Sequence, residues 1–112
     1  MEGATISMKE ENVSCGDVVT VYLKINGEKI EEVSFEGNGC VLSIASASML
    51  TEYLKGKTLV QLEKMGYQEL LKMINIDPGP VRMHCATLPL KALKKAAFEH
   101  EHKPVDTATK EL

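Results

Sequence analysis

The sequence predicts an α+β domain in which helices pack on one face of a small antiparallel sheet. The stretch VVTVYLKI, residues 18–25, alternates between apolar and polar side chains, which is the period of a half-buried strand. Asn26-Gly27 follows it, and this pair is the strongest short signal for a β-hairpin. After Gly39 the pattern changes to helical segments. Strands that come first and helices that follow are typical of the α+β class.

The N-terminal part of the chain contains this hairpin and leaves room for one extra strand. Residues 1–14 are polar with weak alternation, and we expect them to form a mobile N-terminal arm. The return strand, EKIEEVSFEG, departs from strict alternation, which predicts a β-bulge near Glu31-Glu32.

Three helical segments are predicted between Cys40 and the proline-rich stretch NIDPGP. The first, VLSIASASMLTEYLKG, ends at Gly56, a residue that often terminates helices. Thr58 and Gln61 form a capping box that opens the second segment. Gly66 separates it from a third short helix, YQELLKMI.

The last helix carries Lys91, Lys94 and Lys95 on the face opposite its leucines and alanines, and we expect these lysines to be solvated. NIDPGP, residues 75–80, is predicted to be a loop. Because proline is costly in a helix interior, Pro89 favours a regular helix that starts near Thr87. A longer, kinked helix is the alternative.

Composition limits the function classes. A chain of 112 residues with 44% apolar side chains fits one domain, which we place at 15–102 with a polar tail at 103–112. The net charge of −3 argues against a nucleic-acid partner. None of the apolar runs is long enough to span a membrane, so we expect no membrane span. The N-terminus lacks a secretory signal pattern, so we expect a reducing, cytoplasmic setting.

Three cysteines, Cys15, Cys40 and Cys85, stand beside turn-like sequence or next to a predicted helix start. Such a position favours the thiolate, which is the form that binds metals. Asp17 and His84 could add an oxygen or nitrogen ligand to three sulfurs. The spacing alone leaves other interpretations open: three unrelated buried cysteines, with Asp17 as a turn residue.

Three motifs change this balance: SCGDVV, EGNGCVLSIASASML and HCATLPLKAL. In this order they resemble the cysteine motifs of the U-type iron–sulfur scaffold family, which includes IscU, SufU and the N-terminal part of NifU. The resemblance runs from about Ser14 to Phe98. It implies a SufE/NifU-like fold and a non-enzymatic scaffold that builds a labile [2Fe–2S] cluster and passes it to recipient proteins.

By the same resemblance, Cys15, Cys40 and Cys85 are cluster ligands, and Asp17 matches a residue linked to cluster lability. His84 matches the IscU branch, so either Asp17 or His84 is the fourth ligand. Zn²⁺ is expected in the isolated protein. The implied partners are a cysteine desulfurase and recipient apo iron–sulfur proteins or carriers. From its place before a helix, Cys85 is our candidate for the first persulfide acceptor.

Two departures from the family qualify the partners and the function. The stretch DPGPVRM replaces the motif read by a specialised Hsp70 chaperone, which we therefore do not expect as a partner. CATLPLKAL is closer to the SufU and NifU-like branches than to IscU. The alternatives are accordingly a zinc-bound persulfide carrier, similar to a sulfurtransferase, and a structural zinc-binding module.

Overall fold

The structure is a computed structural model that describes residues 4–12, 16–39, 41–74 and 79–101. Side chains are not described for residues 12, 41–42, 67, 74 and 79–85. Three strands come first in the chain: β1 (Ile6–Asn12), β2 (Asp17–Asn26) and β3 (Lys29–Asn38). Four helices follow: α1 (Val41–Leu54), α2 (Leu59–Lys64), α3 (Tyr67–Ile74) and α4 (Gly79–His100).

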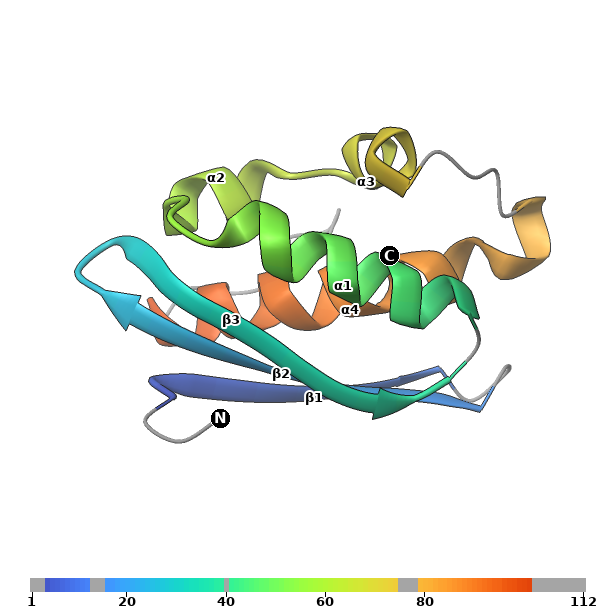
Figure 1. Ribbon diagram of the computed structural model, residues 1–112, viewed down its shortest axis with the longest axis horizontal. Coiled ribbons are helices and arrows are strands. Elements are labelled where there is room, and N and C mark those ends of the chain that lie inside the picture. The colour runs from blue at the N-terminus through green and yellow to red at the C-terminus, as the bar shows by residue number, and fades with distance from the viewer. Residues whose placement is uncertain (1–3, 13–15, 40, 75–78, 102–112) are drawn as a thin grey trace.

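The strands form one antiparallel sheet in the order β1-β2-β3, and the helices lie on one of its faces (Figure 1). The long helix α4 contacts β1 and β2, whereas α1 contacts β3. The predicted α+β class, with helices on one face of a small antiparallel sheet, is therefore confirmed. In the described part of the chain, no helix is long and apolar enough to cross a bilayer.

The hairpin of β2 and β3 follows the prediction. Gly27 takes a φ of 65° in the turn, a left-handed conformation that glycine adopts without steric cost. Lys24 pairs with Glu32, but the next residue, Ile25, pairs with Ile30. Glu31 is therefore the extra residue of a bulge, as predicted. On the solvent face of the hairpin, partial burial and a hydrogen bond to the Glu36 carboxylate raise the pKa of Tyr22.

The prediction of a mobile arm at residues 1–14 is wrong for Ile6–Asn12, which form the edge strand β1. Its register runs from Ile6 opposite Leu23 to Asn12 opposite Asp17. Ile6 and Met8 pack against the core, while Lys9 on the other face is exposed. Weak alternation is enough here because only one face of an edge strand is buried.

The first helices begin and end where the sequence predicts. Gly56, with a φ of 85°, follows the end of α1. The capping box is present: Thr58 Oγ1 accepts from the Gln61 backbone, and the Gln61 side chain accepts from the Thr58 backbone. Gly66 separates α2 from α3.

The preferred start of the last helix near Thr87 is wrong, because α4 begins at Gly79 and contains Pro89. Gly79 and Pro80, predicted to lie in a loop, are helical, while residues 75–78 of that loop lie outside the described residues. Pro80 stands in the first turn, where its missing N–H is not needed. Pro89 does cost a hydrogen bond in the helix interior, but every residue from Ala86 to Leu90 is buried. Burial of this segment offsets the intrinsic cost.

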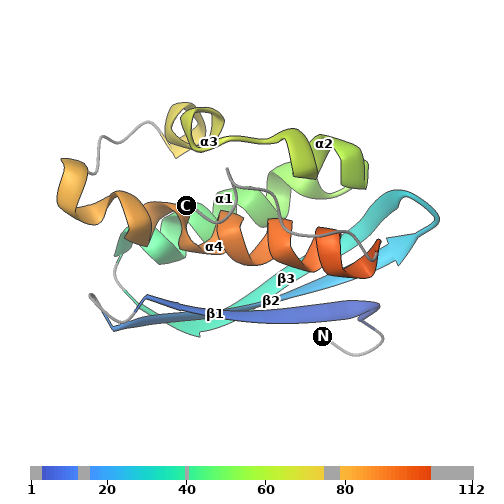
Figure 2. The ribbon, with the colours of Figure 1, turned by 180° about the vertical axis from the view of Figure 1, so that it is seen from behind.

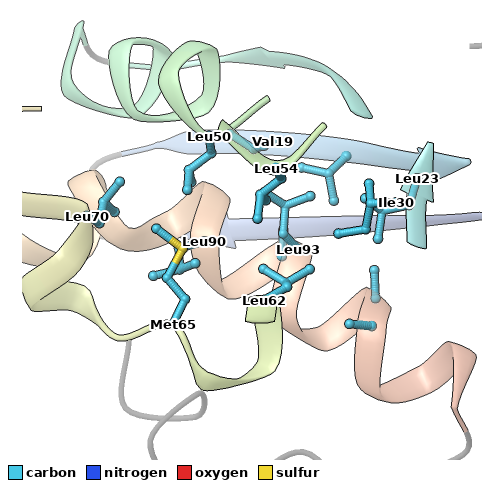
Figure 3. Close-up of a cluster of buried hydrophobic side chains, with 14 of the residues drawn as sticks. Val19, Leu23, Ile30, Leu50, Leu54, Leu62, Met65, Leu70, Leu90 and Leu93 are labelled. Carbon is cyan, nitrogen blue, oxygen red and sulfur yellow. The ribbon is translucent and has the colours of Figure 1, made fainter. Parts of the chain in front are cut away.

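One hydrophobic cluster joins the sheet to all four helices. Figure 3 shows side chains from β2, α1, α2 and α4 converging, among them Leu23, Leu54, Leu62 and Leu93. An apolar residue such as Met49 is usually core-filling, but here it is 37% exposed.

The predicted solvated lysine face is also wrong in part. Lys94 is 3% exposed, and its ammonium donates to the Met65 carbonyl over 2.8 Å. Lys95 forms an ion pair with Glu10 on β1. The charged ends of both lysines therefore meet partners outside α4.

Candidate metal centre

Four segments meet at one end of the molecule. β2 begins there at Asp17, β3 ends there at Asn38, and the register pairs Val18 with Asn38. Helix α1 starts three residues later, at Val41. Figure 1 shows the first turns of α4 at the same end, on the right, and Figure 2 shows the same arrangement from behind. Residues distant in the sequence therefore share one corner of the fold.

The Asp17 side chain lies inside this corner. It is 2% exposed although it is the first residue of β2. Ser43, in the first turn of α1 and fully buried, donates a hydrogen bond from Oγ to Asp17 Oδ2 over 2.6 Å. This length lies at the short end of the range for O–H···O hydrogen bonds. The alternative interpretation of Asp17 as a turn residue on the surface therefore does not fit its burial and its hydrogen bond.

Two glycines allow the chain segments at this corner to pack closely together. A Cβ on Gly39 would lie 2.9 Å from Asp17 Cγ and 3.0 Å from Oδ1. At Gly37 a Cβ would clash with the Val18 carbonyl oxygen. Glycines at such positions would let the backbone approach a bound ion closely. In the structure, the space that they leave is filled by Val18 and Asp17.

The predicted site residues are described to different extents. Asp17 is placed in full, at the start of β2. His84 and Cys85 are residues of α4, but their side chains are not described. Cys15 and Cys40 lie outside the described residues. Within the described part of the chain, no group of three His, Cys, Asp or Glu side chains could hold a metal ion. The ligand set of Cys15, Asp17, Cys40, His84 and Cys85 therefore stays a prediction.

The position of Cys85 differs from the prediction. It was expected at or just before a helix N-terminus, but α4 begins at Gly79, so Cys85 lies more than one turn inside the helix. The positive end of a helix dipole acts mainly on the first turn. Helix-end activation of the Cys85 thiolate therefore loses its structural basis.

The sequence predicts that three serines of α1, Ser43, Ser46 and Ser48, are helix-packing residues. Ser43 in fact contacts the Asp17 carboxylate. Ser46, one turn further along α1, is fully buried, and its Oγ has no hydrogen-bond partner among the described residues. Ser48 is exposed, so it is not a packing residue. The i, i+3 spacing of Ser43 and Ser46 on an otherwise apolar helix face was the available signal.

The sheet, the one-sided helical layer and the buried carboxylate where they meet define a small α+β domain with a polar corner. A family model described as the NifU-like N terminal domain matches residues 2–107. The chain therefore belongs to the NifU-like N-terminal domain family, and the family resemblance expected from its motifs is confirmed.

Several curated relatives are similar over most of this chain. The iron–sulfur cluster assembly scaffold protein IscU 1 of Archaeoglobus fulgidus is 35% identical over 82% of the chain, which spans only 60% of that relative. IscU of Azotobacter vinelandii is 35% identical, with 80% of this chain and 70% of the relative covered. The zinc-dependent sulfurtransferase SufU of Bacillus subtilis is 33% identical, with 87% and 78% covered.

Solved structures share the fold. A putative iron–sulfur cluster assembly scaffold protein for the SUF system, from Fervidobacterium islandicum, superposes with a TM-score of 0.73 at 30% identity, covering 87% of this chain and 83% of that one. The N-terminal part of a NifU-like protein from Brucella abortus gives a TM-score of 0.74, covering 93% and 84%. At 20% identity, this second match supports the fold alone.

Proposed function

We propose that the protein is a scaffold for iron–sulfur cluster assembly. It builds a labile [2Fe–2S] cluster on Cys15, Cys40 and Cys85 and transfers the cluster to recipient proteins. Family membership and the relatives named as assembly scaffolds support this proposal. The cluster is the cargo of such a protein, because it is assembled and then passed on.

The contact between Asp17 and Gly39 is the structural observation that carries the proposal. Asp17 stands two residues after Cys15, and Gly39 stands immediately before Cys40. A Cβ on Gly39 would lie within 3.2 Å of three Asp17 side-chain atoms, so these two flanking residues touch. The contact supports a site to which both cysteine motifs contribute. The first turns of α4, which carry His84 and Cys85, lie at the same end of the molecule.

The residues available at this corner suit a transient cluster. Three thiolates bind iron firmly, whereas a carboxylate or imidazole in the fourth position is exchanged more readily. Asp17 and His84 are the two candidates for that position. An exchangeable fourth ligand gives the thiolate of a recipient protein a place to enter.

The cysteine desulfurase is the proposed source of sulfur. In the proposed step, a scaffold thiolate attacks the terminal sulfur of a desulfurase persulfide. The old S–S bond breaks, and the desulfurase cysteine leaves as a thiolate. Cys85 remains our candidate acceptor, now without support from a helix N-terminus. The scaffold acts stoichiometrically and not as an enzyme, in the reducing cytoplasm that free thiols require.

A zinc-bound persulfide carrier is the second candidate function. The relative from Bacillus subtilis, which is named a zinc-dependent sulfurtransferase, favours it. Under this alternative, the same residues hold Zn²⁺ and relay sulfur without ever holding iron. Sulfur, nitrogen and oxygen donors in a set of four suit Zn²⁺ as well.

Anaerobic incubation with ferrous iron, sulfide and thiol separates the two functions. The scaffold function predicts a visible charge-transfer spectrum and about two irons per cluster-bearing unit, measured by iron and sulfide analysis. A protein that stays free of iron while one zinc ion remains tightly bound favours the sulfur carrier.

Asp17→Ala tests the lability assigned to this residue. We expect a longer-lived cluster, because the substitution removes the exchangeable oxygen through which a recipient or chelator enters. The decay of the visible absorbance with a chelator present measures this lifetime. Glu32→Ala, which removes an exposed carboxylate near the opposite end of the hairpin, is the control. Equal decay in Asp17→Ala and the wild type would refute the role of Asp17.

A further inference from the structure

Ser43 holds one oxygen of the Asp17 carboxylate. The Ser43 hydroxyl donates to Oδ2 over 2.6 Å, and both residues are buried, at 0% and 2% exposure. They come from different elements, 26 residues apart in the sequence. Because both groups are buried and the hydrogen bond is short, the Asp17 carboxylate has few alternative orientations. The bond therefore ties this carboxylate of β2 to the first turn of α1.

Gly39 limits the same carboxylate from another direction. A Cβ at this position would approach Asp17 Cγ to 2.9 Å, Oδ1 to 3.0 Å and Cβ to 3.2 Å. The Gly39 backbone therefore lies directly against the carboxylate. Between this backbone and the Ser43 hydroxyl, the Asp17 side chain has little freedom to rotate.

Ser46 shows that burial of a serine on this helix face does not by itself require a partner. It lies one turn further along α1, is also 0% exposed, and its Oγ has no hydrogen-bond partner among the described residues. The two serines thus share residue type, helix and burial. Of the two, Ser43 bonds Asp17, so the pair offers a matched comparison.

We propose that Ser43 is a positioning residue, whose hydroxyl orients the Asp17 carboxylate as a metal donor at this corner. The inference rests on the proposed function, in which Asp17 serves the metal site. Metal-ligating carboxylates are commonly fixed by a hydrogen bond from an outer residue. Ser43 acts through Asp17, so its effect depends on the presence of the Asp17 carboxylate.

The test measures the Zn²⁺ affinity of the purified chain by competition with a chromophoric chelator. Loss of an outer hydrogen bond to a metal ligand typically costs about 10–100-fold in affinity, and we expect that loss in Ser43→Ala. Asp17→Ala should lose at least as much. The double variant Ser43→Ala/Asp17→Ala should match Asp17→Ala alone, because Ser43 then has no carboxylate to orient.

Two further variants separate positioning from packing. Ser46→Ala removes an equally buried hydroxyl from the same helix and should keep the wild-type affinity within about twofold. Ser43→Thr retains the hydroxyl and should recover most of the affinity lost in Ser43→Ala. Far-UV circular dichroism of each metal-free variant verifies that the fold is kept.

The outcomes separate the inference from the proposed function. Wild-type affinity in Ser43→Ala, an equal loss in Ser46→Ala, or additive losses in the double variant would overturn the positioning role. An Asp17→Ala variant with wild-type zinc affinity would overturn it as well, because Asp17 would then not be a donor. The proposed function fails separately, if the wild-type protein assembles no cluster in the reconstitution experiment.

Discussion

Gly39 shows, at the scale of a single residue, how a missing side chain shapes the corner of the fold. Its position against the Asp17 carboxylate leaves no room for even a methyl group. The carboxylate is itself held by Ser43, so it cannot simply rotate away. A substitution at Gly39 must therefore move the carboxylate, the chain before α1, or both.

We expect Gly39→Ala to lower the free energy of unfolding by about 1–3 kcal/mol, the usual cost of overpacking. It should also weaken Zn²⁺ binding, because the displaced carboxylate is the proposed donor. Chemical denaturation and chelator competition measure the two effects. Gly66→Ala is the control: its Cβ would meet nothing within 4 Å. Since Gly66 directly precedes α3, that change should cost no more than about 1 kcal/mol. Equal stability of the Gly39→Ala variant and the wild type would contradict the steric argument.

Lys94 is a second residue whose role depends on its surroundings. Its ammonium donates to the carbonyl of Met65, the C-cap residue directly after α2. The last carbonyls of a helix lack intrahelical partners, so a cation there is favourable. Lys94 thereby joins the end of α2 to α4.

Lys94→Met should lower the free energy of unfolding by about 1–3 kcal/mol, because it leaves a buried carbonyl without this charged donor. Hydrogen exchange should report lost protection in α2 before the rest of the chain. Lys91→Met is the matched control, since Lys91 lies on the same helix and is only half-buried. It should change stability by no more than about 0.5 kcal/mol. Similar losses in both variants would show that the Met65 contact is not the cause.

At the scale of elements, β1 is held by more than its strand pairing. It is an edge strand, and α4 lies over it on the covered face (Figure 2). The ion pair between Lys95 and Glu10 joins the two, with side chains only 29% and 13% exposed. Partial exclusion from water strengthens such a pair relative to one in solvent.

A double-mutant cycle with Glu10→Gln and Lys95→Met should give a coupling energy of about 1 kcal/mol, the upper end of the range for exposed ion pairs, because this pair is partly buried. The pair of Lys9 and Glu11 on the same strand provides the comparison, at 3.4 Å and with side chains 62% and 53% exposed. Its coupling should fall below about 0.5 kcal/mol. Urea denaturation at two salt concentrations measures both cycles. Equal couplings would mean that burial of the Glu10 pair contributes nothing.

At the scale of the whole molecule, one hydrophobic core joins the sheet and the helical layer. The buried cluster takes side chains from β2, β3 and all four helices. A domain with such a core does not need a metal ion in order to fold.

Removal of zinc with a chelator should therefore leave the far-UV circular dichroism and the cooperative melting transition in place. The melting temperature should fall, because a ligand at about 100 times its Kd stabilises the folded state by ~2.7 kcal/mol. For a chain of this size, that corresponds to a shift on the order of 10 °C. Loss of the helical signal on chelation would instead favour a structural zinc-binding module.

Local patterns in the sequence were sufficient for much of the fold. The alternation in β2, the Asn26-Gly27 turn and the bulge at Glu31 depend on neighbouring residues, and so does the Thr58–Gln61 capping box. The start of α4 was not predictable in this way. Local rules count Pro89 as a helix breaker, but burial of the residues around it against the sheet and α1 overrides that preference.

The candidate site divides along the same line. The sequence alone determined the family, the cysteine motifs and the position of Asp17 two residues after Cys15, because these are properties of residue type and order. Only the tertiary structure decided that Ser43 holds Asp17 and that Gly39 lies against it. It also decided that Lys94 is buried and that β1 completes the sheet. Contacts between residues far apart in the chain depend on how the layers pack, and no local pattern encodes that geometry.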